Sequence, residues 1–265
     1  MNILALDTAT DACSAALLHN GQPYEVFELA PRRHTHLILQ QIEQSLAAAS
    51  LNLQDIDALA FGQGPGAFTG LRIAAGVVQG LALAIDKPVI AVSTLAAMAL
   101  QAIDQQQATT VYVGLDARMS EVYWGVYQAA SAPISIQATT HHLPTVKTLC
   151  VDCVIKPDSV PLPQQQTGQP TDNKHPASGC WAIGSAWQAY PDALTQRLQA
   201  QSIELPNTQI LPDFYPSAAY IARLAWVKAL TQPQESLLDA AQAQPIYLRN
   251  KVAQTIAERQ QQAAR

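Results

Sequence analysis

The chain has 265 residues, of which 49% are hydrophobic. This composition excludes a wholly disordered protein, because disorder requires low hydrophobicity and high charge. Only 13% of the residues are charged, and 20 acidic residues against 15 Lys and Arg give a net charge of −5. We do not expect such a chain to bind a long nucleic acid through its own electrostatic field, since phosphate binding needs clustered positive charge. A function on RNA would therefore require a partner that supplies this charge.

The first residues and the apolar stretches predict neither a signal peptide nor a membrane-spanning segment. Residues 1–6 run directly into Asp7, without a basic region or a small-residue cleavage site. The longest apolar stretch, Leu71–Ile85, is too short for a bilayer and contains Arg72 and Gln79. Four cysteines in a chain of this length do not suggest a disulfide framework. We therefore expect a cytoplasmic location.

The first half of the chain predicts alternating strands and helices. Strands are predicted over residues 2–6, 13–19, 22–29, 56–61 and 88–92, and helices over 31–50, 71–85 and 94–103. Asn20-Gly21 predicts a tight hairpin between the second and third strands, because both residues tolerate positive φ. Gly62–Gly70 forms a glycine-rich connection that leads into the second helix.

The second half begins in the same way and then becomes less regular. Strands are predicted over residues 111–115, 121–128, 134–140 and 181–184, and helices over 185–201 and 218–230. Residues 156–178 are rich in Pro, Gln, Thr and Asp, which is typical of a loop or insertion. The residues from Ala253 onward predict a frayed polar tail.

The two halves share one order of elements, which indicates an internal duplication. Ile3–Asp7 and Val111–Asp116 are apolar strands that end in aspartate, and the two aspartates lie 109 positions apart. Each aspartate is followed by a turn and by another apolar strand. The repeated order therefore predicts two similar α/β halves.

Asp7, Thr8 and Thr10 bring a carboxylate and two hydroxyls to the end of the first strand, and Asp116 occupies the equivalent place in the second half. Such turns can hold a phosphate or a hydrated Mg²⁺ through side chains and backbone amides. The same residue types also cap tight turns with their own side chains. These four residues are the candidates for nucleotide or phosphate binding.

The connection Gly62–Gly70 is neither a Walker loop nor a dinucleotide fingerprint, because no Gly-Lys-Ser/Thr follows and the glycine spacing is wrong. Its amides could bind an anion at the helix N-terminus, or its glycines could permit tight turns and close packing. In the helix that follows, Gly76, Gly80 and Ala84 repeat on one face. Glycine costs about 1 kcal/mol relative to alanine in a helix interior. That face therefore indicates a closely packed partner, within the chain or across a subunit interface.

Cysteine spacing gives no complete metal site. Cys150 and Cys153 have the spacing of a redox motif or of half a zinc site, but Cys13 and Cys180 stand singly and provide no second pair. No nucleophile-elbow pattern is present either. The residues alone predict neither a metal centre nor a Ser-His-Asp hydrolase.

Six segments form an ordered set of motifs along the chain. They are Ile3–Thr10, Gly62–Arg72, Gln79–Leu83, Val92–Leu95, Asp116–Trp124 and Pro245–Asn250. Together they resemble the TsaB (YeaZ) family. The likeness is dense over residues 1–128 and thins through 130–215, where the Pro/Gln-rich insertion lies.

The resemblance implies the duplicated actin/Hsp70/sugar-kinase-like (ASKHA) α/β fold, with two lobes that each contain a mixed sheet flanked by helices. It implies an N-terminal lobe over residues 1–106, which carries the dimerisation helices. The C-terminal lobe would cover 107–265, with the insertion near 156–178 and the polar tail.

The resemblance also implies a role in making N6-threonylcarbamoyladenosine at position 37 of tRNAs that read ANN codons. A chain of this family is expected to be a non-catalytic activator of the related subunit TsaD, with the ATPase TsaE as a further partner. It is expected to form a homodimer when alone and to meet tRNA only through the complex.

TsaD binds a metal through a His-x-x-x-His motif, and on this sequence those positions fall on Thr94 and Met98. Neither residue suits a hard or borderline metal, so no metal is expected. Nucleotide-binding members of the superfamily show a Gly-Gly turn, whereas Ile183–Ser185 contains one glycine. We therefore expect no enzymatic activity and no required cofactor for this subunit alone, with ATP or ADP only in the complex.

The resemblance places the interface with TsaD, or with a second copy, on two helices of the first lobe. The expected contact residues are His34, Leu37, Ile38, Gln41, Phe68, Arg72, Gly76, Gln79 and Gly80. Two alternatives remain open. One is an ATP-dependent phosphotransferase that uses Asp7 and Asp116 around Mg²⁺. The other is a peptidase, which the missing His pair and the missing nucleophile pattern disfavour.

Overall fold

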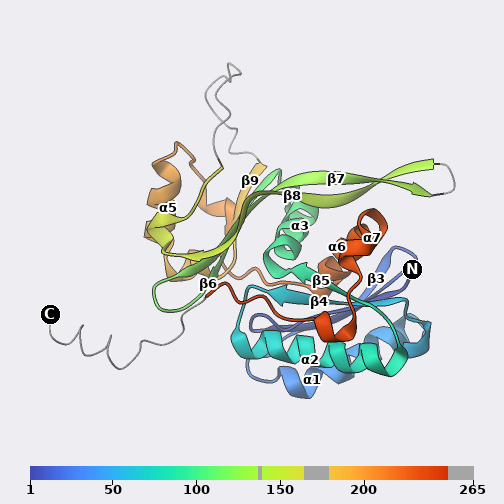
Figure 1. Cartoon of the computed structure of the whole chain (residues 1–265). Helices are drawn as coiled ribbons and strands as arrows, with labels where there is room; N and C mark the ends of the chain where they lie inside the picture. The colour runs from blue at the N-terminus through green and yellow to red at the C-terminus, as the bar shows by residue number, and fades with distance from the viewer. Residues whose placement is uncertain (137–138, 164–178, 250–265) are drawn as a thin grey trace.

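The computed structural model of the chain describes residues 1–136, 139–163 and 179–249. Two five-stranded sheets lie one above the other, with helices between them and on both outer faces (Figure 1). The predicted tail from Ala253 and residues 164–178 of the predicted insertion lie outside the described residues.

The first sheet has the strand order β3-β2-β1-β4-β5. Its strands are β1 (Ile3–Asp7), β2 (Ala12–His19), β3 (Gln22–Leu29), β4 (Ala58–Gly64) and β5 (Val89–Ser93). β1, β2 and β3 form an antiparallel meander, whereas β4 pairs in parallel with β1 and β5 with β4. Asn20 and Gly21 have φ values of 50° and 78°, which confirms the predicted hairpin.

The second sheet repeats this arrangement, with the order β10-β9-β6-β7-β8. Its strands are β6 (Thr110–Asp116), β7 (Val122–Ile136), β8 (Thr139–Ile155), β9 (Cys180–Ile183) and β10 (Ile210–Leu211). β6, β7 and β8 are antiparallel neighbours, and β9 and β10 continue the sheet in parallel. The repeated topology confirms the predicted duplication and the two-lobed ASKHA-like α/β fold.

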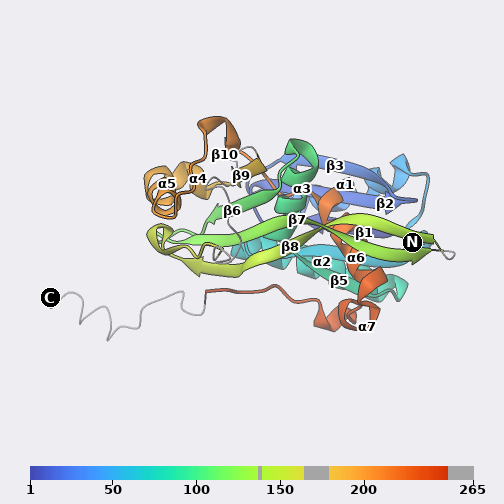
Figure 2. The same cartoon turned by 90° about the horizontal axis from the view of Figure 1, so that it is seen from above.

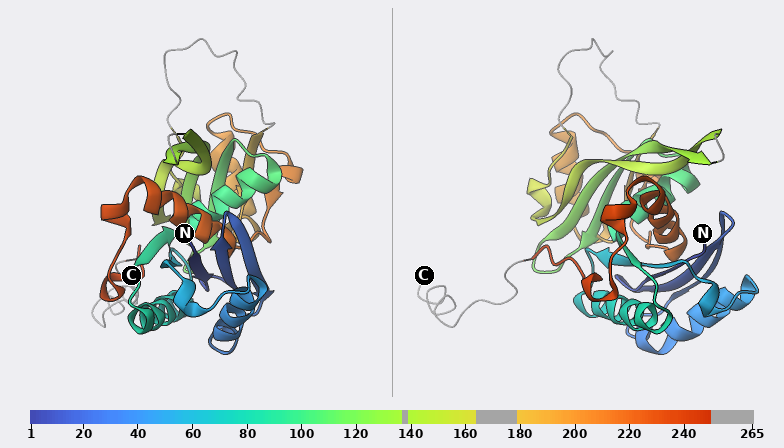
Figure 3. Two further views of the ribbon diagram at one scale, coloured as in Figure 1. Left: turned by 90° about the vertical axis from the view of Figure 1, so that its right-hand side faces the viewer. Right: turned by 45° about the vertical axis from the view of Figure 1, so that its right-hand side comes forward.

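Seven helices surround the sheets in the described part of the chain. They are α1 (His34–Ala48), α2 (Phe68–Ile85), α3 (Thr94–Gln106), α4 (Ala186–Ala189), α5 (Pro191–Gln199), α6 (Ala218–Thr231) and α7 (Pro233–Ser236). α1 and α2 cover the outer face of the first sheet, and α4 and α5 cover the outer face of the second. α3 and α6 lie between the sheets (Figures 1 and 3).

Strands β1, β2, β4 and β5 of the first sheet are buried on both faces, which explains their nearly continuous apolar sequences, whereas the edge strand β3 is mostly exposed. Side chains alternate along a strand, so Leu4 and Leu6 of β1 pack toward α1 and α2. Ile3 and Ala5 point the other way and pack against α6. α6, which belongs to the second half of the sequence, therefore completes the core on this face of the first sheet.

The prediction of one strand over residues 134–140 is wrong. β7 extends to Ile136, and β8 runs from Thr139 to Ile155, so these residues belong to two long antiparallel strands. The β7–β8 hairpin reaches past the rest of the second sheet (Figures 1 and 2). Exposed residues such as Lys147 and Thr148 interrupt the apolar alternation by which a strand is recognised.

The predicted single helix over residues 185–201 is also wrong. α4 ends at Ala189 and α5 begins at Pro191, because proline lacks the N–H of a helix interior but fits a first turn. The first residues of α1 and α2 each differ by three positions from the prediction. α1 begins at His34, three residues later than predicted, and α2 begins at Phe68, three residues earlier.

Residues 237–249, which we call the C-terminal strap, cross the first lobe beside α2 (Figure 1). Leu238 pairs with Val89 of β5, and Ala243 is buried in the core under α2. Further along, the amide of Ile246 donates to the carbonyl of Gln63, 2.8 Å away. The strap is thus attached to the first sheet, to α2 and to the glycine-rich connection.

α2 is the one described helix that is long and apolar enough to span a membrane, with a mean hydropathy of 1.6 over 18 residues. Core helices can pass the same length and composition test. Seven residues of α2 are buried against the first sheet, and the opposite face is exposed.

Trp124→Ala should lower the free energy of unfolding by about 3–5 kcal/mol. The ring is fully buried between Tyr112 and Trp187, at centroid distances of 6.3 and 5.8 Å. Urea unfolding followed by circular dichroism measures the loss. Val151→Ala on β8 is the control, because Val151 is 79% exposed and its loss should change stability by about 0.5 kcal/mol or less. Equal stability of the two variants would contradict this account of the core.

Candidate functional site

Asp7 lies at the carboxyl end of β1, where its side chain is buried. The amide of Ala9 donates to Oδ1 over 2.9 Å, and the Thr94 hydroxyl donates to Oδ2 over 3.3 Å. Burial removes water from the carboxylate and raises its pKa from 3.8 to about 6, which outweighs the opposite effect of the two hydrogen bonds. A Cβ at Gly62 would overlap Oδ2, so the glycine-rich connection closes over this side chain.

The turn after Asp7 is filled by the same connection. The Thr8 hydroxyl donates to the carbonyl of Gly70 over 2.7 Å, and a Cβ at Gly70 would overlap the Thr8 carbonyl. The amide of Ala67 donates to the carbonyl of Ala9 over 2.7 Å. Thr10 Oγ1 accepts from the backbone two residues later. The glycines therefore permit close packing, and the turn residues bond within the chain.

Asp116 lies at the equivalent end of β6 but has different partners. Arg118 donates its amide to Oδ1 over 2.8 Å and pairs its guanidinium with Oδ2 at 3.0 Å. The Tyr190 hydroxyl donates to Oδ1 over 3.3 Å. No described contact joins Asp116 to Asp7. The two aspartates thus belong to separate hydrogen-bond networks.

Thr94 and Met98 lie on the first two turns of α3, and both are buried. Thr94 bonds to Asp7, and Met98 packs in the apolar core against the second sheet. Within residues 1–136, 139–163 and 179–249, no group of three or more His, Cys, Asp or Glu could hold a metal ion. Thr94 and Met98 therefore do not fit the metal of a His-x-x-x-His site.

Three of the expected interface residues are buried within the protomer. His34 Nε2 bonds to the carbonyl of Thr10 at 2.9 Å, and the Gln41 amide donates to the carbonyl of Cys13 over 3.1 Å. Ile38 packs in the core of the first lobe. The stripe of α1 that carries these residues faces the first sheet, so they cannot line a free surface.

The other expected interface residues lie at the surface or at its edge. Leu37 and Gln79 are half-buried, whereas the remaining members are exposed: Phe68, Arg72, Gly76 and Gly80. All four exposed residues are on α2. The structure adds Leu83 of α2, which the sequence analysis missed. Its apolar character was visible in the sequence, but its outward direction was not.

The C-terminal strap borders this exposed part of α2, which the sequence analysis also missed. The Arg72 guanidinium lies 3.9 Å from the Phe68 ring centre, and its Nε donates to the Tyr247 hydroxyl over 3.0 Å. The Gln79 amide donates to the carbonyl of Ala243 over 2.9 Å. The motif at residues 245–250 was the only signal in the sequence for this contact.

A second, partly buried polar cluster joins the two lobes. The hydroxyls of Ser93 and Tyr127 both donate to the carboxylate of Asp152. Ser93 ends β5, whereas Tyr127 and Asp152 belong to β7 and β8. Burial raises the pKa of Asp152 and, together with the neighbouring carboxylate, that of Tyr127.

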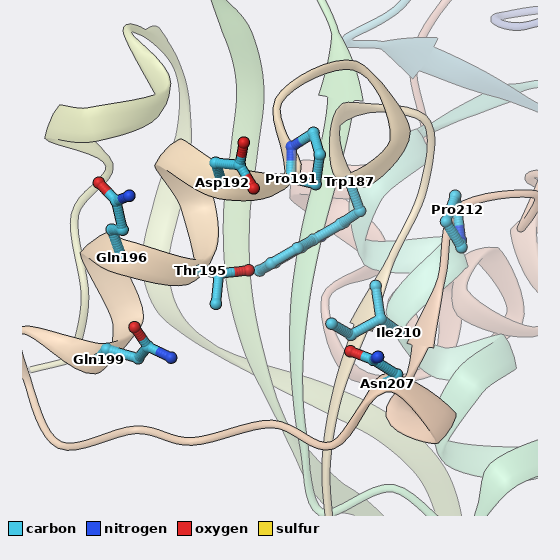
Figure 4. Close-up of a pocket in the computed structure, with 9 residues that line it drawn as sticks. All are labelled: Trp187, Pro191, Asp192, Thr195, Gln196, Gln199, Asn207, Ile210 and Pro212. Carbon is cyan, nitrogen blue, oxygen red and sulfur yellow. The ribbon is translucent and has the colours of Figure 1, made fainter.

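A hollow of about 570 Å³ lies on the outer side of the second lobe, between α5 and the segment that carries β10 (Figure 4). Trp187 projects across it toward Thr195, and Asp192 is its one lining carboxylate. None of the predicted site residues lines this hollow.

The match with known proteins covers nearly the whole chain. Residues 26–257 match the model of the TsaD family, tRNA N6-adenosine threonylcarbamoyltransferase. The chain is 39% identical to the tRNA threonylcarbamoyladenosine biosynthesis protein TsaB of Escherichia coli strain K12, over 96% of both chains. The chain belongs to the TsaB family. Its TsaB relative in Haemophilus influenzae is 37% identical over 95% of both chains.

A solved structure agrees with this assignment to the TsaB family. YeaZ from Pseudomonas aeruginosa is 35% identical, with a TM-score of 0.71 over 93% of this chain and 99% of that one. The resemblance that the six sequence motifs carry is therefore confirmed. The chain is a member of a family of tRNA threonylcarbamoyladenosine biosynthesis proteins.

Asp7→Asn should change how stability depends on pH in this TsaB-family chain. Because the folded pKa is about 6 against 3.8 for the free group, Asp7 favours the folded state below pH 4, and this contribution is lost as pH rises through 6. The loss amounts to about 3 kcal/mol, at 1.36 kcal/mol per pKa unit. Asn should accept from Ala9 and donate to Thr94 without titrating.

Urea unfolding of both proteins between pH 4 and 8 measures this difference. The stability of the Asn variant relative to the native chain should rise with pH and level off above about pH 7. A difference that stays constant over this range would show that Asp7 does not titrate with a raised pKa.

Proposed function

We propose that this TsaB-family chain is a non-catalytic cytoplasmic subunit that binds and activates a TsaD-type transferase. The product would be N6-threonylcarbamoyladenosine at position 37 of tRNAs that read ANN codons. TsaE would be a further partner. In the absence of its partners the chain would form a homodimer, and it would contact tRNA only as part of the complex. The subunit alone would need no cofactor, and ATP or ADP would enter only in the complex.

The observation that carries the proposal is the exposed face of α2. A Cβ at Gly76 or Gly80 would meet no atom within 4 Å, so both glycines face solvent. Phe68 and Leu83 on the same helix are 52% and 75% exposed. Covering apolar surface contributes about 25 cal/mol per Å², and small residues let a partner helix approach closely. This face supports a helix of a partner protein packing against α2.

The separate surroundings of Asp7 and Asp116 support a non-catalytic role. Asp7 is covered by the glycine-rich connection, and Asp116 is paired with Arg118. A phosphotransferase would need both carboxylates turned toward a shared Mg²⁺ and phosphate. At the positions where TsaD carries its metal-binding histidines, Thr94 and Met98 are engaged in the core instead.

Gly76→Leu should reduce binding of the TsaD-type protein of the same organism at least 100-fold, because the side chain would stand between the two helices. The free protomer should stay folded and become more stable by up to about 1 kcal/mol, since nothing lies within 4 Å of the new Cβ and glycine is a poor helix former. Calorimetric titration measures the affinity. Threonylcarbamoyl transfer to unmodified tRNA, with and without this chain, measures activation.

Two variants control this experiment. Gly76→Ala adds one methyl group and should retain most of the binding. Gln196→Leu places the same apolar side chain on exposed α5 of the second lobe and should bind normally. The proposal fails if Gly76→Leu still activates the transferase fully, or if the transferase works equally well without this chain.

A further inference from the structure

β3 is an edge strand of the first sheet, on the side opposite to β5 and the C-terminal strap (Figure 2). The amide of Ala30, the residue that follows β3, donates to the carbonyl of Asp11 over 2.9 Å. In an antiparallel pair, such bonded positions alternate with positions whose N–H and C=O point away from the neighbouring strand. By the register of β2 and β3, the backbone groups of Glu25, Phe27 and Leu29 therefore point outward.

This outward side of β3 is open over a short stretch. Pro23 occupies the next outward position and has no N–H, which prevents strand pairing toward the β2–β3 hairpin. In the described part of the chain, no backbone hydrogen bond reaches the outward N–H and C=O groups of Glu25, Phe27 and Leu29. Unpaired groups of this kind are a template for another strand, and most sheets cover or block them. Glu25 to Leu29 thus form an available edge.

A hollow of about 560 Å³ lies beside this edge, between β3, α3 and the segment before α6. Phe27 and Leu29 line it from β3 and are 43% and 52% exposed. Gln101 lines it from α3, and its buried Oε1 accepts no hydrogen bond from the described residues. Phe214 supplies a third apolar side chain. Because opposite residues of neighbouring strands share a face, an added strand would direct alternate side chains into this hollow.

The rim of the hollow is acidic. Asp213 is the one charged side chain that lines it among the described residues. Burial and the neighbouring carboxylates of Asp213 and Asp11 raise the pKa of the Tyr215 hydroxyl, so both carboxylates lie near this ring. Asp213 and Asp11 are exposed, and no Lys or Arg of the described ranges forms an ion pair with either. A cation of a partner would be attracted to this rim.

We propose that the β3 edge binds an extended segment of another protein, which joins the first sheet as an added strand. The backbone groups of Glu25, Phe27 and Leu29 would hold the segment. Two large apolar side chains, two positions apart, would enter the hollow, and a Lys or Arg would reach Asp213. Such recognition takes its affinity from main-chain hydrogen bonds and its specificity from alternate side chains. The site does not use α2, so the inference is independent of the proposed function.

Peptide selection on the full chain tests the site and its preference. A phage-displayed library of random peptides should yield sequences with two large apolar residues two positions apart and a neighbouring Lys or Arg. A synthetic, fluorescein-labelled copy of a selected peptide is then titrated with each variant. Asp213→Asn should weaken its binding about threefold and make the affinity less sensitive to salt. Val151→Ala, at an exposed apolar residue of the edge strand β8, should bind normally.

Two substitutions at Phe27 separate the side chain from the backbone. Phe27→Ala should weaken binding of the labelled peptide about tenfold, because the ring no longer lines the hollow. Phe27→Pro removes the same ring and also the outward N–H, so its binding should be about fivefold weaker still. The N–H that is lost has no partner within the described chain, so proline is tolerated there. Circular dichroism checks that both variants fold.

Amide hydrogen exchange followed by NMR tests the strand pairing on the unaltered chain. The amides of Glu25, Phe27 and Leu29 should exchange quickly in the free chain, whereas those of Val26 and Glu28, which point toward β2, should be protected. The selected peptide should slow exchange at the first three.

Four results would overturn the proposal. The library yields no peptide of the expected pattern, or the selected peptide binds both Phe27 variants as tightly as the native chain. The three outward amides stay unprotected in the complex, which would mean that a ligand of the hollow forms no strand. Their protection in the free monomer would show that another part of this chain covers the edge. Protection that appears only at high protein concentration would assign the edge to a second copy.

Discussion

The close approach of the glycine-rich connection to the β1–β2 turn determines how the first lobe is built. Side chains at Gly62 and Gly70 are excluded because Asp7 Oδ2 and the Thr8 carbonyl occupy that space. α2 begins at the end of this connection, so the contact fixes where the helix starts and which face lies on the sheet. The exposed face of α2 is therefore a consequence of packing at the turn.

The two turns that follow Asp7 and Asp116 differ in the residues that contact them. In the first lobe the glycine-rich connection fills the turn and buries Asp7, which raises its pKa. In the second lobe Arg118 neutralises Asp116, and Arg249 of the C-terminal strap donates to the carbonyl of Arg118. The duplicated fold has thus retained both carboxylates, and each has different partners in its own lobe.

The two lobes are joined by a helix and by a cluster of polar side chains. α6 packs on the first sheet although it follows the second in sequence. The cluster of Ser93, Tyr127 and Asp152 links the end of β5 to β7 and β8. Breaking these hydrogen bonds would leave the partly buried carboxylate of Asp152 without its two donors. The cluster therefore helps to hold the two sheets together.

The sequence by itself determined the elements whose signals are local. Apolar runs, the Asn20-Gly21 turn and the repeated strand–aspartate pattern predicted β1 to β5, α1 to α3 and the duplication, and the motifs predicted the family. Tertiary structure alone decided that β8 is a long strand and that His34, Ile38 and Gln41 face inward. It also brought Arg249 to a loop 130 residues away. Helix periodicity shows that two faces differ, but only packing against the sheet decides which face water reaches, and long-range contacts leave no local pattern in the chain.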